Sequence, residues 1–192
     1  MKIIFGGAFN PPTIAHKEIY KYVMERIKAD SFIYLPVSTL YTKNGLESNE
    51  HRYNMLKLLV KGTNALVSRD EIDDLNYKGT HAYLKSLNEE SMFLMGSDNL
   101  RTLDTWINYP TLIKECKFIV ISRGNLDDES YIKNDEVLSK YKDNFILLKG
   151  FDMDISSSKF RKTKDKNLLT KEVYEYIKEN KLYEVLWWKI VF

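Results

Sequence analysis

The apolar residues of the chain are concentrated in short, continuous runs. They occupy residues 2–5, 31–37, 65–68, 91–96, 117–122 and 144–149. Runs without alternating polar positions are typical of strands that are buried on both faces. Segments with apolar residues at helical spacing separate these runs. They predict helices at 14–28, 50–61, 80–88, 98–104, 110–115 and 131–141, and two more within about 156–180.

This alternation of strands and helices predicts right-handed βαβ units and therefore a parallel sheet. We expect residues 1–192 to form a single doubly wound, Rossmann-like α/β domain with a five- or six-stranded parallel sheet. Ligands of such sheets bind outside the carboxyl ends of the strands. The polar segments 38–49 and 123–130 are expected to be loops.

Composition and charge exclude several classes of protein. The chain has 29 Lys and Arg residues against 27 Asp and Glu residues, so it has no general attraction to nucleic acid. The single Cys116 excludes an internal disulfide and a cysteine-based zinc site. No uncharged apolar stretch reaches about 18 residues, and the N-terminus has no signal-peptide cleavage site. We therefore expect a cytoplasmic protein with no membrane partner.

The final segment, residues 186–192, is unusually apolar for the end of a chain. It is expected either to pack on its own domain or to form a contact in a homo-oligomer.

The first strand is followed by residues that favour an anion site. Gly6 and Gly7 lack side chains, so their backbone can take φ > 0 and approach a ligand closely. The next helix presents free N–H groups at its start, near Thr13 and His16, and His16 lies on its sheet-facing side. Neither a Walker A pattern nor a G-x-G-x-x-G fingerprint is present. A histidine satisfied within the protein is the alternative interpretation of His16.

A second candidate anion site lies in the segment DISSSKFR, residues 154–161. If a helix begins after Ser156, then Ser157, Ser158 and Arg161 share one face. Hydroxyl groups and a guanidinium would then converge, and the arginine fork suits bidentate contact with a phosphate. A capped helix with a solvated arginine is the alternative.

The two segments together resemble the H-x-G-H nucleotidyltransferase superfamily. The stretch GGAFNPPTIAH resembles its first motif, with Asn10 where Asp is usual and Ala15 where Gly is usual. The stretch ISSSKFR resembles its second motif. The resemblance implies that ATP binds at Gly6, Gly7, Ala8, Phe9, Thr13, His16, Gly96, Asp98, Ile155, Ser157, Ser158 and Arg161.

Between these motifs the chain resembles bacterial nicotinate-mononucleotide adenylyltransferases. The matching positions include Lys43, Arg52, Thr80, Gly96, Asp98, Trp106 and Arg123. The resemblance implies that the acceptor binds at Thr80, Trp106, Lys43 and Arg123. Trp106 would stack on a pyridine ring and Asp98 would accept a hydrogen bond from adenosine. Core packing for Trp106 and an N-cap role for Asp98 remain alternatives.

The family implies transfer of AMP from ATP to nicotinate mononucleotide. The nucleophile is already an anionic phosphate, so positioning and electrostatic stabilisation should dominate catalysis. We expect His16, Lys43 and Arg161 to surround the phosphates, and Mg²⁺ to be held by ATP and water rather than by a protein-built metal site. Alternative acceptors are nicotinamide mononucleotide and phosphopantetheine. A nucleotide-binding module without catalytic activity is the alternative from another class.

Overall fold

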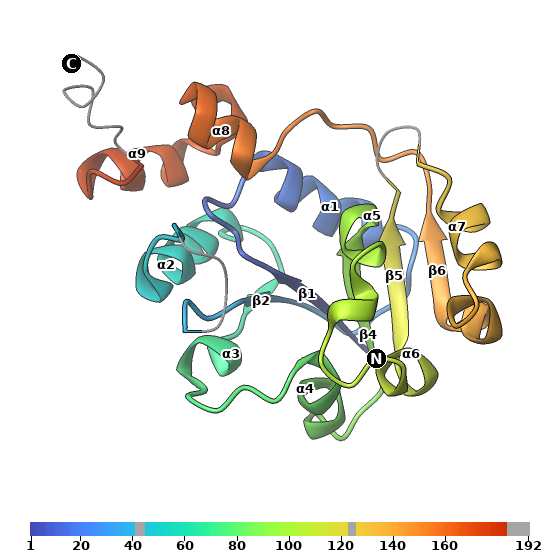
Figure 1. The fold of residues 1–192 in the computed structure, drawn as a ribbon. Helices are drawn as coiled ribbons and strands as arrows, with labels where there is room; N and C mark the ends of the chain where they lie inside the picture. Colours follow the sequence, from blue (N-terminus) through green and yellow to red (C-terminus); the bar gives the residue numbers. More distant parts are fainter. Residues whose placement is uncertain (41–44, 123–125, 184–192) are drawn as a thin grey trace, which may run out of the picture.

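The strands of the chain form one parallel sheet. The computed structural model describes residues 1–40, 45–122 and 126–183. Its sheet has six strands in the order β3-β2-β1-β4-β5-β6, with every neighbouring pair parallel. The strands are β1 (Lys2–Gly7), β2 (Ser31–Pro36), β3 (Leu66–Val67), β4 (Ser91–Gly96), β5 (Lys117–Ile121) and β6 (Phe145–Leu148). The expected α/β fold with a parallel sheet is confirmed (Figure 1).

Helices cover both faces of the sheet (Figure 1). The α-helices are α1 (Ile14–Met24), α2 (Asn49–Leu59), α3 (Asp70–Asp73), α4 (Thr80–Ser86), α5 (Ser97–Leu100), α6 (Thr111–Glu115), α7 (Asp128–Asn134), α8 (Ser157–Thr163) and α9 (Lys171–Glu179). Short 3-10 helices are η1 (Leu103–Thr105), η2 (Leu138–Asn144) and η3 (Lys166–Leu168). After β6 the chain crosses back so that α8 and α9 lie on the side of α1 and α2 (Figure 1). Within the described ranges, no helix has the length and apolar character needed to cross a membrane.

The helix expected at 131–141 is wrong, because the chain forms two elements there. α7 ends before Asp135, whose carboxylate accepts hydrogen bonds from the backbone N–H groups of Val137 at 2.9 Å and Leu138 at 2.8 Å. Such a side-chain acceptor competes with helical hydrogen bonding and starts a new turn, here η2. The short helix α3 was not expected, because its acidic sequence resembles a solvated loop.

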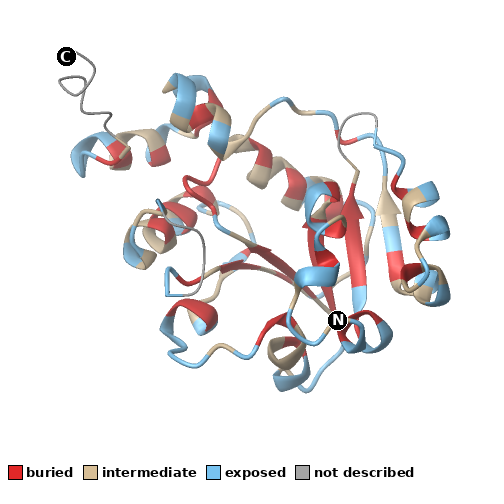
Figure 2. Cartoon of the chain, viewed as in Figure 1, coloured by how far each residue is buried: buried red, intermediate tan, exposed pale blue. Residues whose placement is uncertain are grey.

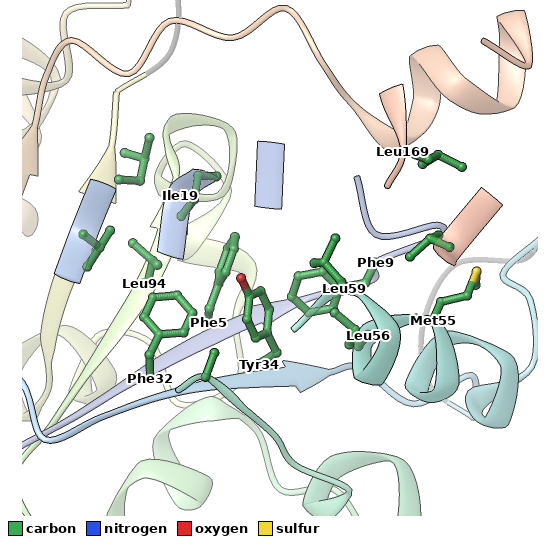
Figure 3. Packing of buried hydrophobic residues seen from close by; sticks show 14 of the residues in the cluster. Phe5, Phe9, Ile19, Phe32, Tyr34, Met55, Leu56, Leu59, Leu94 and Leu169 are labelled. Carbon is green, nitrogen blue, oxygen red and sulfur yellow. The ribbon is translucent and has the colours of Figure 1, made fainter. Parts of the chain in front are cut away.

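The two faces of β1 pack into separate hydrophobic clusters, because successive side chains of a strand point to opposite faces. Ile3 and Phe5 pack with residues of α1, α2 and α9, and Ile4 packs with residues of α4, α6 and α7. Figure 3 shows the first cluster around Phe5 and Tyr34, beside Leu56 of α2. Figure 2 shows that the central strands are mostly buried. Each fully buried large apolar side chain contributes about 1.5–3 kcal/mol, so these clusters hold the carboxyl edge of the sheet in place.

The connections that leave β1 and β4 cover opposite faces of the sheet. After β1, α1 packs in the first cluster through Ile19 and Val23. After β4, the chain packs in the second cluster through Leu100 and Leu112. Neighbouring parallel strands with diverging connections leave a crevice at their carboxyl ends. The fold therefore predicts a binding site at the carboxyl ends of β1 and β4.

Candidate active site

The two glycines at the end of β1 are required by packing. Neither glycine uses the positive φ that glycine permits. A Cβ on Gly6 would lie 2.4 Å from Cζ of Phe93 on β4, and a Cβ on Gly7 would lie 3.1 Å from Cζ of Phe9. Phe93 is buried and cannot move aside cheaply. The end of β1 therefore exposes bare backbone toward the crevice.

Thr13 and His16 fix each other at the start of α1. The backbone N–H of Thr13 donates to Nδ1 of His16 at 2.9 Å, and the Thr13 Oγ1 lies 2.9 Å from the same nitrogen. His16 thus takes the place of the Glu or Gln in a capping box. Because Nδ1 accepts, the neutral imidazole carries its proton on Nε2. The ring also packs against Phe5 and Phe9, with centroids 6.0 and 5.1 Å away. Its orientation is therefore held from several sides.

The second motif contacts the first directly. Ser156 caps α8 by accepting from the Lys159 N–H at 3.1 Å. The Ser157 hydroxyl donates to the Pro11 carbonyl at 2.8 Å. The Arg161 guanidinium donates to the Asn10 carbonyl at 2.6 Å and to Ser158 Oγ at 3.1 Å. We call residues 8–16 and 156–161 together the motif junction. Both predicted anion-binding segments thus meet, while Ile155 packs against the first hydrophobic cluster.

A buried arginine holds the loop after β1 against β2. Arg52 on α2 is fully buried, and its guanidinium donates to the carbonyl oxygens of Ala8 at 2.8 Å, Val37 at 2.6 Å and Glu47 at 2.9 Å. It also donates to Asn49 Oδ1 at 2.7 Å. A guanidinium presents five donors in a fixed plane, which suits this set of carbonyl groups. Arg52 therefore fixes the start of the loop that forms the first half of the junction.

A pocket of about 550 Å³ lies beside the end of β1. Of the predicted residues, it brings together Gly6, Gly7, Ala8, Thr80 and Trp106. The sequence did not predict the other residues that line the pocket. They are Val37, Leu46, Glu71, Tyr77, Gly79, Phe93, Asn99, Thr102, Thr105 and Ile107. Its walls combine apolar and aromatic side chains with a few polar groups, which is typical of small-molecule sites.

The wall near Thr80 depends on a glycine with an unusual backbone angle. Gly79 precedes α4 and has φ +92°, a backbone conformation that residues with a side chain rarely adopt. A Cβ there would lie 2.7 Å from Cβ of Ile107. The Thr80 side chain is buried, and its Oγ1 lies 3.2 Å from the hydroxyl of Tyr77. Gly79 therefore makes room where α4 begins and places the Thr80 backbone at the pocket.

Trp106 serves both packing and the pocket. Its ring meets Phe93 edge-on, with centroids 5.6 Å apart, and Phe93 is the residue that requires a glycine at position 6. Trp106 is only half-buried and lines the pocket. Core packing and a pocket wall are therefore compatible at this position, because one edge of the ring packs while part of it stays exposed.

Glu71 is a buried acid that sequence reasoning missed. It is 4% exposed and lines the pocket from α3. Burial, followed by the charge of Glu71, raises the pKa of Tyr77 to about 12. Glu71 lies in the acidic run DEIDD, residues 70–74, which resembles a solvated surface segment. The signal that could have indicated burial is the apolar neighbour Ile72, which is buried with Glu71 in the short helix α3.

The loop after β4 is held by a buried polar cluster. Gly96 is the N-cap of α5, so the N-cap role considered for Asp98 is wrong, and Asp98 is exposed in the first turn. The Ser97 hydroxyl lies 2.7 Å from Asp128 Oδ2, and Arg101 donates to Asp128 Oδ1 at 2.6 Å. Asp128 was not predicted, since its loop showed no pattern. Its partners fix the backbone that carries Asp98.

A second hollow, of about 700 Å³, lies at the carboxyl ends of β5 and β6. Its lining includes Ser122, Asp127, Lys149 and Phe151, and none of those predicted site residues that the structure describes. Asp127 precedes Asp128, so this hollow adjoins the loop that carries Asp98.

Two predicted residues lie outside the described part of the chain. Lys43 falls within residues 41–44 and Arg123 within residues 123–125, and the apolar segment 186–192 is also outside. Among the described residues, no group of three or more His, Cys, Asp or Glu side chains is arranged to hold a metal ion.

Solved structures share the fold over almost the whole chain. Nicotinic acid mononucleotide adenylyltransferase of Plasmodium falciparum, complexed with APC, has a TM-score of 0.76 and 22% identity, over 95% of this chain and 96% of that one. The same enzyme complexed with NaAD has a TM-score of 0.73 and 23% identity over the same shares. At this identity, the likeness establishes the fold.

Sequence comparison identifies the family. Residues 4–163 match the cytidylyltransferase-like family. A protein of Acholeplasma laidlawii named "Probable nicotinate-nucleotide adenylyltransferase" is 36% identical, over 96% of this chain and 98% of its own. One of the same name from Clostridium acetobutylicum is 32% identical, over 95% and 98%. The chain therefore belongs to the cytidylyltransferase-like family and, within it, to the nicotinate-nucleotide adenylyltransferases.

Proposed function

We propose that this protein transfers AMP from ATP to nicotinate mononucleotide, giving nicotinate adenine dinucleotide and pyrophosphate. The observation that carries the proposal is the motif junction, where Ser157 and Arg161 hold the loop after β1 next to a pocket of about 550 Å³. The names of its relatives support this acceptor. The junction supplies donors for phosphates, and the pocket supplies walls for a ring.

The reaction is an in-line displacement at phosphorus. An oxygen of the acceptor phosphate attacks the α-phosphorus of ATP while the bond to pyrophosphate breaks. His16 would donate from Nε2 to an α-phosphate oxygen, since Nδ1 is occupied by Thr13. Arg161 would stabilise charge that develops on the leaving pyrophosphate. Lys43 is proposed as a further cation at these phosphates.

Serine and threonine side chains of the junction would act mainly by placing other groups. The Ser157 hydroxyl uses its proton on Pro11, so it holds the loop rather than donating to a phosphate. Ser158 accepts from Arg161 and can still donate its own proton to an oxygen of ATP. Thr13 orients His16. Reacting groups held in one geometry lower the entropic part of the barrier.

The acceptor would occupy the pocket, with its pyridine ring against Trp106. The backbone N–H groups near Thr80 would receive its carboxylate, and the Gly79 conformation exposes them. Glu71 lines the same pocket and disfavours a negative charge placed against it. We therefore place the carboxylate toward Thr80 and the ribose hydroxyls toward Glu71. Adenosine would lie toward Gly96, Asp98 and Ile155. Arg123 is proposed, with Lys43, as a further contact to the acceptor.

Nucleotidyltransferases of this kind generally use a divalent metal. We propose that the metal is Mg²⁺ and that it enters with ATP. The donor set of the junction fits this arrangement, because hydroxyl and cationic groups there leave the metal to phosphate oxygens and water. When bound, Mg²⁺ neutralises charge on the triphosphate.

The proposal is tested by measuring pyrophosphate release from ATP with each of three acceptors. Nicotinate mononucleotide should support turnover, with nicotinamide mononucleotide slower and phosphopantetheine inactive. Release with phosphopantetheine alone would reassign the acceptor. ATP binding without release with any acceptor would support the nucleotide-binding module.

A further inference from the structure

Asn10 lies at the centre of hydrogen bonds that tie the first motif to distant segments. Its carbonyl accepts from Arg161 at 2.6 Å. Its side-chain Nδ2 donates to the Gly45 carbonyl at 3.2 Å. Its Oδ1 accepts from the Glu47 N–H at 3.1 Å and from the Tyr183 hydroxyl at 2.7 Å. One side chain thus connects the loop after β1, the segment before α2 and the segment after α9.

The chemistry of an amide fits these partners. Asn10 is 2% exposed, so its side chain must find partners within the protein. An amide offers both a donor and an acceptor, whereas a carboxylate only accepts. A carboxylate at position 10 would therefore face the Gly45 carbonyl oxygen without a proton between them. Asn10 can therefore donate to Gly45 and accept from Glu47 and Tyr183 at the same time.

Tyr183 reaches the junction from the C-terminal end of the described chain. Its ring meets Phe160 edge-on at 5.9 Å, and Phe160 precedes Arg161 on α8. Its backbone N–H donates to Glu47 Oε1 at 3.4 Å. Burial raises the pKa of the Tyr183 phenol, so the hydroxyl keeps its proton and donates to Asn10. The ring thus touches α8 while the hydroxyl touches the loop that α8 holds.

We propose that Tyr183 and Asn10 form a positioning pair that sets the guanidinium of Arg161 toward the phosphates. Tyr183 fixes the Asn10 side chain, and the Asn10 carbonyl then fixes one arm of Arg161. The remaining guanidinium donors keep the direction that this contact gives them. This inference rests on the proposed function, in which Arg161 contacts the triphosphate.

The test is Tyr183→Phe, which removes the hydroxyl and keeps the ring on Phe160. Two quantities are measured: the single-turnover rate at saturating MgATP and nicotinate mononucleotide, and the dissociation constant of MgATP alone. We expect the rate to fall about five- to tenfold, as for one lost hydrogen bond of about 1 kcal/mol. The MgATP dissociation constant should rise about threefold.

Tyr176→Phe is the matched control. Tyr176 also lies at the C-terminal end of the chain, on α9, and its hydroxyl bonds His51 at 3.0 Å and Asn54 at 3.3 Å on α2. The control likewise loses the hydrogen bonds of a tyrosine hydroxyl near the C-terminal end, without touching the junction. We expect its rate and MgATP affinity to equal those of the wild type.

Coupling to Arg161 separates positioning from general stability. In an Arg161→Ala background, or Arg161→Lys if that variant does not fold, Tyr183→Phe should cause no further loss. An equal loss in both backgrounds, or no loss in the single variant, overturns the positioning pair. If the wild type forms no dinucleotide, the proposed function fails. The coupling in MgATP affinity then still decides whether the pair positions Arg161.

Discussion

The motif junction and the pocket beside it are built in different ways. At the junction, polar groups from distant segments meet, as in the bonds from Ser157 to Pro11 and from Arg161 to Asn10. In the pocket, space is left open because glycines stand where side chains would collide, as at Gly79. The transfer rate should therefore fall when a side-chain group is removed from the junction. The acceptor affinity should fall when a group is added to the wall of the pocket.

The largest expected effect is on the junction. Arg161→Ala and His16→Ala should each lower the rate by about 10²–10³, the usual cost of losing one donor to developing charge. The free energy of unfolding should change by about 1 kcal/mol, since each variant loses one or two hydrogen bonds and leaves no large cavity. Turnover at saturating MgATP and urea unfolding measure the two quantities.

Arg161→Lys sharpens this test. It should recover only part of the lost rate, because one ammonium cannot reproduce the guanidinium fork. Wild-type turnover in His16→Ala, or an unfolded Arg161→Ala, would contradict the electrostatic role for that residue.

Adding a methyl group should affect the pocket next most strongly. Gly79→Ala places a Cβ 2.7 Å from Ile107 and strains a φ of +92°. We expect acceptor affinity to fall about tenfold, as for an overpacking cost of about 1–3 kcal/mol. Gly62→Ala is the control, because Gly62 has φ +78° with nothing within 4 Å of its Cβ. Gly62→Ala should lower the free energy of unfolding and leave the acceptor affinity unchanged. Equal acceptor affinity in the two variants would contradict the steric role of Gly79.

Removing the aromatic wall should have a smaller effect. Trp106→Ala should weaken acceptor binding about two- to twelvefold, as for a stacking contact of about 0.5–1.5 kcal/mol, and leave ATP affinity nearly unchanged. Calorimetric titration with each substrate measures both. If the two affinities fall together in a folded variant, Trp106 acts through its packing on Phe93.

The smallest expected effect concerns Lys164, which follows α8. Burial, followed by the charge of Arg161, lowers the pKa of Lys164 below its ordinary value of 10.5. The folded state thus disfavours the charged ammonium. Lys164→Met should therefore raise the free energy of unfolding at neutral pH, by less than about 0.5 kcal/mol because the group is only partly buried.

The pH dependence of this gain has a defined sign. Below the lowered pKa, Lys164 is charged in both states, and the gain from Lys164→Met is complete. As the pH rises toward 10.5, the folded protein deprotonates first and the gain disappears. Urea unfolding of both proteins at neutral pH and near pH 10.5 measures it. A gain that grows with pH would show that the sign is wrong.

Local patterns predicted the junction because each half is a short segment with its own chemistry. Buried apolar runs predicted the strands. Apolar helical spacing placed the start of α1, and a capping signal placed the start of α8, close to their observed positions at Ile14 and Ser157. The contact between Ser157 and Pro11 follows from the parallel sheet, which brings the carboxyl ends of its strands to one edge.

The pocket was predicted less completely because tertiary packing makes its walls. Gly79 is needed only because Ile107 lies opposite, and no local pattern connects the two positions. Glu71 is buried by the way α3 packs, although its acidic neighbours resemble a surface segment. Asp128 acts through Ser97 on a different strand connection. Each of these residues acquires its role from a distant partner.

The long reach of the junction contacts has a consequence for protein synthesis. Ser157 and Arg161 meet the loop after β1 across 146 and 151 residues of sequence. On the ribosome, that loop is made early and its partners are made late. A chain that stops before α8 lacks the groups that hold the Asn10 and Pro11 carbonyls. If Arg161 acts as we propose, nascent and prematurely terminated chains should transfer AMP far more slowly than the full chain, and full activity should begin only when translation has passed α8.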